Sequence, residues 1–400
     1  MGSMRQLRTA VETSPVEEVL VRLGELAPLL CQSAAEAERL ARLPKPVVRA
    51  LQRYGLFRLW VPKKCAGFEL DLGEALEVFE AAARLDGSIG WAVMMGCQGG
   101  LFASQLDAPT ANSLFARPES VIATAMAPEG RAVRVAGGYR VTGCWHYVTG
   151  APYATAFLAN CIFVESGTLV FGDQGRPDTR AVLLDASQVS IVPSWDASGL
   201  RGTGSDDFEV RDVLVPEQRT FSLTQPTSRE LGALYRLPLN AVTELAITAV
   251  ALGIAQHALD EFAVVTRTKK APSGGGQGAS LGEDPGVHTR YAEARATWGL
   301  IKAGVEALAR RVWRDALATR NPSHIESSEV TATCALAVAK LRAAVSELVA
   351  LVGMNAIQPD SELARAWRDL QALAAHGAVS PRNLTTIGAT LLAASGSLSR

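Results

Sequence analysis

The residues best suited to chemistry in this sequence lie near its end, in the stretch from Leu363 to His376. The stretch reads as a helix with His376 at its far end, and the chain contains only five histidines. An imidazole titrates near pH ~6.5, so it can take or give a proton under neutral conditions. Arg365, Asp369, Leu373 and His376 recur at steps of three or four residues, which predicts one shared helix side. We therefore expect His376 to face inward, while arginine stems brace the helix below it. By itself, this pattern fits a capping or core histidine near a helix end as well as a catalytic group.

The chain divides by hydrophobic periodicity into three segments, and the predicted helix lies in the third. Apolar residues recur at three- and four-residue steps from about Pro15 to Ser113, which predicts helices. From about Val121 to Val215 the period becomes two, with turn signals between the runs, which predicts strands. From about Arg229 onward the pattern is helical again. Four long helices are expected there, over Ala241–Val265, Arg290–Leu317, Ser327–Leu351 and Ser361–Ala375.

These segments predict an α+β chain of three domains. An N-terminal α-helical domain would span residues 1–118, a β domain 119–225, and a C-terminal four-helix bundle 226–400. A segment of roughly 95 residues made of short strands suits a small barrel or sandwich. Strands are expected over Val121–Ala125, Tyr139–Gly143, Ala156–Asn160 and Arg180–Leu184.

The composition narrows the class of function. Apolar residues make up 48% of the chain and charged residues 20%, with a formal charge of -1, which suits a soluble protein with a large core. We therefore expect no nucleic-acid partner and no membrane partner, since no apolar run reaches the ~20 residues that span a bilayer. The six cysteines form no C-x-x-C pair. This spacing argues against a metal site and favours reduced thiols in the cytoplasm.

The order of helices, β domain and helical bundle resembles the acyl-CoA dehydrogenase fold, and two motifs support the resemblance. The run Gly143-Cys144-Trp145-His146-Tyr147-Val148-Thr149-Gly150 resembles the strand that contacts flavin in that fold, Gly-x-x-x-Trp-Ile-Thr-Asn. The segment from Gly199 to Asp207 is similar to the later Gly-x-Arg-Gly-Ser segment, and Val213-Leu214-Val215-Pro216 to the Val-x-Val-Pro run after it. The resemblance covers nearly the whole chain.

Strand geometry assigns faces within the first motif. Side chains alternate along a strand, so Trp145, Tyr147 and Thr149 would share one face and His146 would lie on the other. By itself, this pattern also fits an ordinary amphipathic strand with aromatic residues in a core. The resemblance implies flavin binding by Trp145, Tyr147 and Thr149, with Tyr147 packing on the isoalloxazine and Thr149 reaching N5. His146 would then be a surface or packing histidine.

The resemblance implies further flavin contacts outside this motif. Trp195 and Ser205 correspond to positions near the flavin, and Arg267 resembles an arginine that reaches a flavin phosphate across a subunit interface. For each of the three, a purely structural role is an equal alternative. The fold is commonly a homotetramer, which we expect here. Asp206 and Asp207 are adjacent on a predicted strand and should point apart, so they are not expected to share a proton.

Within this fold, the C-terminal signature looks like the two-component (group D) flavin-dependent monooxygenases. It reads Leu363-x-Arg365-x-Trp367-Arg368-Asp369-Leu370, followed by His376. The resemblance implies an oxygenase component that takes reduced flavin, FADH2 or FMNH2, from a separate NAD(P)H:flavin reductase. With O2 it would hydroxylate a hydrophobic, aromatic or polycyclic small molecule through a C4a-(hydro)peroxyflavin. Thr149 would slow the loss of that adduct in a dry pocket, and His376 would handle the substrate proton.

Two departures from the family pattern leave alternatives open. Several monooxygenases of this class carry a second histidine after a Ser-x-x-Trp element; here Trp91 completes the element, but Cys97 and Gln98 stand in the later region. Gln98 can form hydrogen bonds but cannot act as a base near neutral pH. Acyl-CoA dehydrogenases use a glutamate base, and Glu244 on the first bundle helix is the runner-up base here. An acyl-CoA dehydrogenase or related flavin oxidase is therefore the alternative function.

Overall fold

A computed structural model describes residues 14–172, 175–223, 232–269 and 280–397. Its N-terminal part is helical, as predicted. The helices are α1 (Pro15–Leu40), α2 (Lys45–Arg53), α3 (Leu72–Leu85), α4 (Gly87–Leu101) and α5 (Ala108–Phe115). Side-chain caps start four of them: Ser14 caps α1, Asp71 caps α3, Asp107 caps α5, and Asp86 caps α4 by accepting the Ile89 N–H at 3.1 Å. Asp86 thus ends one helix and begins the next.

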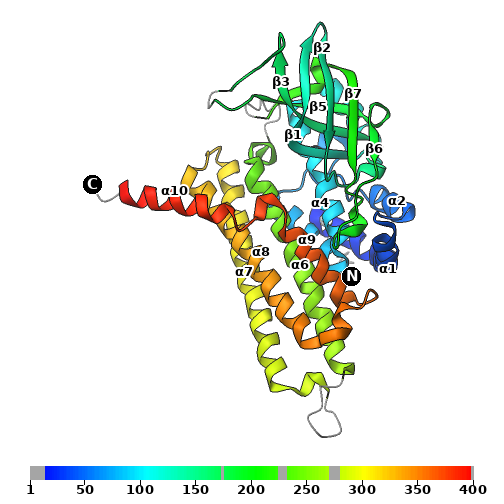
Figure 1. The fold of residues 1–400 in the computed structure, drawn as a ribbon, viewed down its shortest axis with the longest axis vertical. Coiled ribbons are helices and arrows are strands. Elements are labelled where there is room, and N and C mark those ends of the chain that lie inside the picture. Colours follow the sequence, from blue (N-terminus) through cyan, green and yellow to red (C-terminus); the bar gives the residue numbers. More distant parts are fainter. Residues whose placement is uncertain (1–13, 173–174, 224–231, 270–279, 398–400) are drawn as a thin grey trace, which may run out of the picture.

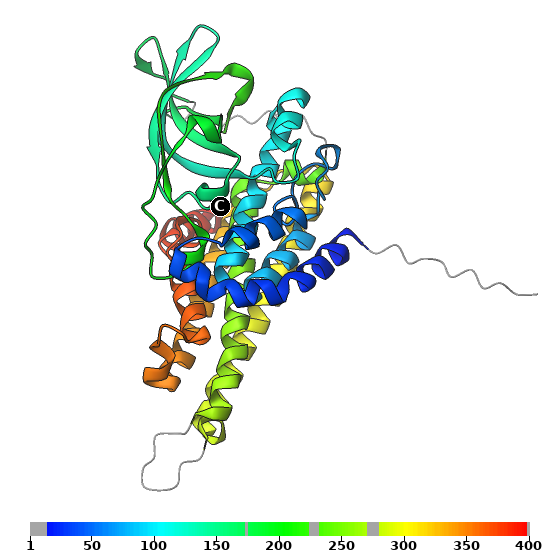
Figure 2. The same cartoon turned by 90° about the vertical axis from the view of Figure 1, so that its right-hand side faces the viewer.

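Within the described ranges, the β part is one sheet of eight strands. They are β1 (Ile122–Val135), β2 (Gly138–Trp145), β3 (Ala156–Glu165), β4 (Thr168–Leu169), β5 (Thr179–Asp185), β6 (Ser190–Val192), β7 (Asp207–Pro216) and β8 (Thr220–Ser222). The order is β6-β7-β2-β1-β3-β5-β8, with β4 paired to β3, and β1 runs parallel to β3. The expected barrel or sandwich is therefore a single mixed sheet that curls above the helices (Figures 1 and 2).

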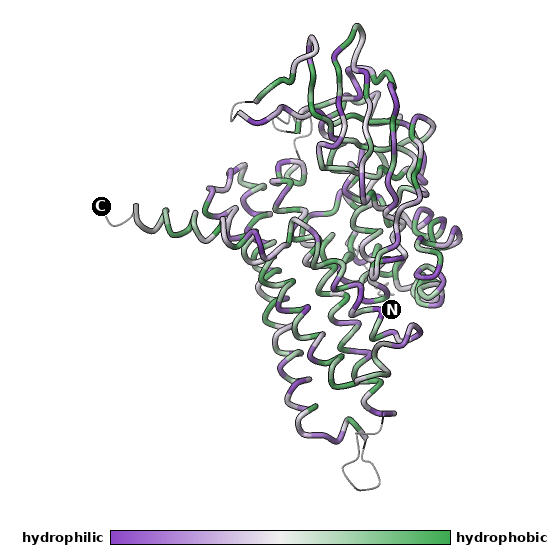
Figure 3. Tube along the Cα trace, viewed as in Figure 1, coloured by the Kyte–Doolittle hydropathy of each residue, from purple (hydrophilic) through white to green (hydrophobic). Residues whose placement is uncertain are grey.

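The four predicted bundle helices are present with somewhat longer bounds. They are α6 (Leu239–Thr268), α7 (Pro285–Leu317), α8 (His324–Val352) and α9 (Glu362–Ala374). A further helix, α10 (Asn383–Ser397), projects sideways from the bundle (Figure 1). Figure 3 shows hydrophobic residues spread along the bundle helices, with hydrophilic residues between them.

Helix α6 is long and apolar enough, by length and composition, to cross a membrane, which the sequence analysis did not anticipate. In the structure 89% of its apolar window is buried. It lies at the centre of the bundle and packs against α3, α8 and α9. Burial inside the protein explains why so few charges interrupt this helix.

One continuous hydrophobic core joins the N-terminal helices to the bundle, while the sheet has a core of its own. Gly253 of α6 lies so close to α3 that an added Cβ would come within 2.2 Å of the Glu80 carbonyl oxygen. Lys302 of α7 pairs with the same Glu80 at 2.6 Å. The predicted division at residue 225 falls in the segment 224–231, outside the described residues.

Candidate active site

A cavity of about 860 Å³ lies where the three parts of the chain meet. Its walls come from α4, β1, the segment after β2, the loop before β7, the first turns of α6, and the turn after α9. Residues from six separate segments line it, among them Trp91, Thr124, Thr149, Ser205, Glu244 and His376. Most of the side chains predicted to be catalytic or to bind flavin therefore line this one cavity.

A chain of hydroxyl groups runs along one wall of this cavity. Trp91 Nε1–H donates to Thr149 Oγ1 at 3.0 Å, and Thr149 Oγ1 lies 2.9 Å from Ser205 Oγ. Ser205 Oγ lies 2.8 Å from Thr203 Oγ1, which donates to the Leu200 carbonyl oxygen at 2.8 Å. Because Thr203 donates to a carbonyl, Ser205 must donate to Thr203, and Thr149 must donate to Ser205. The Thr149 oxygen is left with a free lone pair, so toward the cavity it can only accept a hydrogen bond.

The segment that carries Thr149 is not the regular strand that the sequence predicted. Strand β2 ends at Trp145, and Tyr147 adopts a left-handed backbone with φ 59°. This turn breaks the alternation of faces, so the prediction that Trp145, Tyr147 and Thr149 share one face is wrong. Trp145 is fully buried in the core of the sheet, stacked on Phe208 at 4.9 Å, and does not line the cavity. Its predicted contact with flavin is not supported by this placement.

The same break brings His146 to the cavity instead. Its Nδ1 lies 2.9 Å from Asp207 Oδ2, and this hydrogen bond raises the pKa of the imidazole. Tyr147 is 76% exposed and meets Trp195 edge-on at the cavity mouth, with ring centroids 6.3 Å apart. Asp206 points away from Asp207 and accepts the backbone N–H groups of Ser194 and Trp195. The two aspartates point apart as predicted, and each holds one side of the mouth.

His376 lines the same cavity, and Trp91 contacts both this histidine and the hydroxyl chain. Its ring meets the Trp91 indole edge-on at 5.6 Å. Burial lowers the pKa of the imidazole, so it is neutral at pH 7. Its Nδ1 accepts the Ala378 backbone N–H at 3.2 Å, so the neutral ring carries its proton on Nε2.

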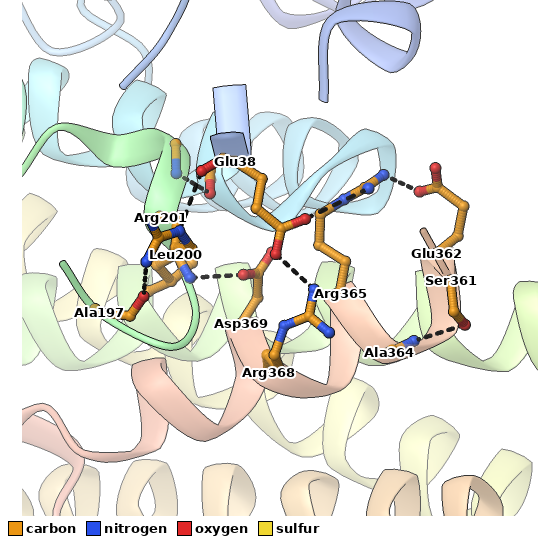
Figure 4. Close-up of polar contacts among 12 residues, drawn as sticks. Glu38, Ala197, Leu200, Arg201, Ser361, Glu362, Ala364, Arg365, Arg368 and Asp369 are labelled. Carbon is orange, nitrogen blue, oxygen red and sulfur yellow. Dashed lines mark hydrogen bonds and ion pairs between the residues drawn. The ribbon is translucent and has the colours of Figure 1, made fainter. Parts of the chain in front are cut away.

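Ion pairs and hydrogen bonds hold helix α9, and with it His376, in place (Figure 4). Arg365 pairs with Asp86 and Glu362, and Arg368 pairs with Glu38. Asp369 accepts the Leu200 N–H at 2.6 Å. Burial and the nearby Asp86 raise the pKa of Asp369 well above its usual range. The bracing predicted for this helix is present, and it also fixes the loop that leads to Ser205.

Of four other candidates, two line the cavity and two do not. Gln98 is 5% exposed and lines the cavity, whereas the Cys97 thiol turns away and donates to the Leu56 carbonyl oxygen. Glu244 lines the cavity from α6. Arg267 is exposed near the far end of the same helix, roughly 35 Å from Glu244 at 1.5 Å per residue. Within one chain it cannot reach the cavity.

The cavity suits a flat ring with polar edges. Thr124 Oγ1 lines it, is buried, and has no hydrogen-bond partner in the described structure. Together with the lone pair on Thr149, it offers hydrogen-bonding positions that a flavin ring would satisfy. Among the described residues, no group of three or more His, Cys, Asp or Glu side chains could hold a metal ion.

Sequence reasoning missed two parts of this site. Trp91 was noted only as the end of a Ser-x-x-Trp element, although it joins Thr149 to His376. That element, together with the family resemblance, could have pointed to it. Thr124 carries no sequence signal, because a single threonine in a strand is common.

Two family models match the chain on either side of the sheet. The N-terminal domain of acyl-CoA dehydrogenase matches residues 25–108, and its C-terminal domain matches residues 245–381. The chain has the acyl-CoA dehydrogenase fold. Its structural similarity to XiaF from Streptomyces sp., solved in complex with FADH2 and glycerol, has a TM-score of 0.86 at 24% identity, over 94% of this chain and 96% of that one.

Two curated relatives of this chain are named as a monooxygenase and as a monooxygenase oxygenase subunit. Indole-3-acetate monooxygenase of Acinetobacter baumannii is 26% identical, with 90% of this chain and 91% of the relative covered. The flavin-dependent monooxygenase oxygenase subunit HsaA of Rhodococcus jostii is 29% identical, with 90% and 94% covered. The chain is an oxygenase component of a two-component flavin-dependent monooxygenase, which implies a separate flavin reductase.

Proposed function

We propose that this oxygenase component uses reduced flavin and O2 to hydroxylate a hydrophobic aromatic or polycyclic small molecule. The observation that carries the proposal is the cavity in which Trp91 joins the hydroxyl chain of Thr149 to His376. When bound, reduced flavin supplies the activation of O2. The side chains around it would orient the ring, hold its proton and exclude water.

Each residue has a role that follows from its hydrogen bonds. Thr149 Oγ1 can only accept, so it would hold the proton at flavin N5 rather than donate to that atom. Trp195 and Tyr147 would cover the ring at the cavity mouth. His376 would offer its Nε2–H to the reacting oxygen or to the substrate. Ser205 keeps Thr149 in this orientation.

The test is anaerobic mixing of the protein with FMNH2 or FADH2, followed by oxygen. We expect a flavin–oxygen species that persists long enough to be seen by stopped-flow absorbance. Thr149→Val keeps the shape but removes the acceptor, and loss of one such hydrogen bond should speed hydrogen peroxide release by roughly tenfold. Absence of both the species and saturable flavin binding in the wild type would disprove the proposal.

The dehydrogenase alternative has less support. The relatives reported above are oxygenases, and the turn at His376 carries no carboxylate. Two carboxylates line the cavity, Glu244 and Glu129. Glu129 is exposed and accepts the His146 backbone N–H at 3.0 Å, so Glu244 is the buried candidate for a base. An acyl-CoA dehydrogenase would purify with tightly bound oxidised flavin and be reduced by an acyl thioester without a reductase.

Assembly and location are also proposals. We propose a homotetramer, in which Arg267 of one chain would reach the flavin phosphate of another. All six cysteines are free thiols, which supports a cytoplasmic location.

A further inference from the structure

Glu244 is a buried carboxyl group that the proposed chemistry does not use. It lies in the second turn of α6, is 6% exposed, and lines the same cavity as His376. Its two carboxylate oxygens accept a hydrogen bond from Thr331 Oγ1 at 2.9 and 3.0 Å. One hydroxyl cannot satisfy a carboxylate, which has about four acceptor positions.

Among the described residues, no cation pairs with Glu244, and no lysine or arginine is among those that line the cavity. The two histidines there do not compensate: His376 is neutral, and His146 faces Asp207. Burial raises the pKa of Glu244 to about 7. Near neutral pH both forms of the carboxyl are therefore present.

An adjoining cavity of about 1050 Å³ shares Glu244 and does contain arginines. Arg311 pairs with Glu329, and Arg320 pairs with both Asp315 and Glu326. Arg236 is exposed to solvent. Two of these charges are already matched, and the third is solvated, so they leave Glu244 without a cationic partner.

A ligand group that meets Glu244 is selected by its charge and its hydrogen-bonding type. A carboxylate on the ligand would face a second acidic group in a desolvated space, which is strongly unfavourable. A ring N–H or O–H would instead fill a vacant acceptor position. The apolar walls from Trp91, Met95 and Phe102 suit the rest of an aromatic molecule.

We propose that Glu244 selects the substrate, which is an aromatic molecule with an N–H or O–H donor on its ring and no anionic group. This inference rests on the proposed function, because it takes the cavity to be the substrate site. It also separates this chain from the relative named for indole-3-acetate, whose substrate carries a carboxylate.

Three matched probes test the preference: indole, 1-methylindole and indole-3-acetate. Binding is measured by isothermal titration calorimetry, with the protein alone and with anaerobic FMNH2. We expect indole to bind roughly tenfold more tightly than 1-methylindole, since methylation removes the only ring donor. Indole-3-acetate should bind at least tenfold more weakly than indole.

Substitutions of Glu244 then test whether this residue causes the preference for indole over the other two probes. Glu244→Leu removes the hydrogen-bond acceptor. The affinity of this variant for indole should therefore be about equal to its affinity for 1-methylindole. Glu244→Gln removes the charge and should improve binding of indole-3-acetate several-fold. Glu261→Gln, on the same helix but outside both cavities, is the matched control and should leave all three affinities unchanged. A thermal unfolding curve for each variant checks that it is folded.

Equal binding of indole and indole-3-acetate by the wild type would overturn the inference. A folded Glu244→Gln variant with the same ratios of probe affinities as the wild type would also overturn it. So would the absence of binding by all three probes, both to the protein alone and to the protein with FMNH2. These outcomes are independent of the oxygen experiment. A protein that forms no flavin–oxygen species but keeps the probe preference would disprove the proposed function alone.

Discussion

At His376, the direction of one hydrogen bond decides what the imidazole can do. Because Nδ1 accepts the Ala378 N–H, the neutral ring presents Nε2–H, a donor. A base role would require a proton to be taken at Nδ1, in place of that hydrogen bond. The sequence predicted a group that takes or shares the substrate proton, and the structure favours sharing through donation.

We predict that His376→Ala lowers the rate of product formation by about 10²-fold, the range of a lost proton-handling group. His376→Gln places an amide N–H near the position of Nε2 and should keep roughly tenfold more activity than the alanine variant. Product is measured by liquid chromatography with reduced flavin supplied chemically. Equal rates for the two variants would refute the donor role.

The lowered pKa of His376 predicts the pH profile of the same reaction. The neutral form is the active one, and burial extends its range to more acidic pH. With substrate saturating, so that protonation of Glu244 in the binding step does not limit the rate, product formation should fall only below pH ~6.5, the ordinary value for a histidine. A rate that already falls between pH ~8 and ~7 would show that a different group controls the step.

The raised pKa of Glu244 predicts a pH-dependent stability. Folding raises it from 4.5 to about 7, so below pH 4.5 the group is neutral in both states and costs nothing. As pH rises from 4.5 through 7, the unfolded state releases the proton more readily, and the folded state loses stability, up to roughly 3 kcal/mol.

Glu244→Gln should therefore stabilise the fold at pH ~8 and change little at pH ~4. Thr331 can still donate to the amide oxygen. The other ionisable groups on the two cavities are the same in both proteins, so the comparison with wild type cancels their contribution: Glu129, His146, Tyr147, His376, Tyr235, Arg236, Arg311, Asp315, Arg320, His324 and Glu326. Urea unfolding at both pH values measures the effect, and an equal gain at both would contradict this assignment.

Among the elements, α9 and the loop before β7 depend on each other. An added Cβ at Gly199 would lie 2.0 Å from the Arg368 carbonyl oxygen, so the loop backbone rests directly on the helix. Asp369 receives the next backbone N–H, that of Leu200. The loop carries Ser205 and the helix ends just before His376, so this contact fixes the positions of these two cavity residues relative to each other.

We predict that Gly199→Ala destabilises the protein by roughly 3 kcal/mol, because neither backbone can move away without losing this contact. Gly304→Ala, on exposed α7 with nothing within 4 Å of the added Cβ, is the control. It should be neutral or stabilising by up to ~1 kcal/mol. Similar thermal unfolding for both variants would show that the loop and helix can separate freely.

The sequence predicted these elements unevenly, for physical reasons. Periodic patterns revealed α6 to α9 and the main strands, because burial on one face repeats along the whole element. The break after Trp145 was invisible, since a single left-handed residue such as Tyr147 leaves no periodic trace. The partners of His376 and Glu244 could not be predicted either, because Trp91 and Thr331 lie far away in sequence and meet them only through packing.

In the whole molecule, the cavity exists only because three parts of the chain are packed together. The N-terminal helices and the bundle share one core, and the sheet caps their junction. α10 extends away from this body, with Leu392 76% exposed. Arg267 is likewise remote from its own cavity. Both features are exposed surface that a second copy of the chain could contact.

We predict that the protein is a tetramer in solution, with the mass of four chains by light scattering after size exclusion. Arg267→Ala should keep that mass but weaken reduced-flavin binding by roughly tenfold, because an arginine–phosphate hydrogen bond is charge-assisted. Indole binding without flavin should not change, since Arg267 lies far from its own cavity. Arg211→Ala, which removes an exposed arginine paired with Glu209, is the control for lost positive charge. If the protein is a monomer, and Arg267→Ala binds reduced flavin as tightly as the wild type does, Arg267 has no role across an interface.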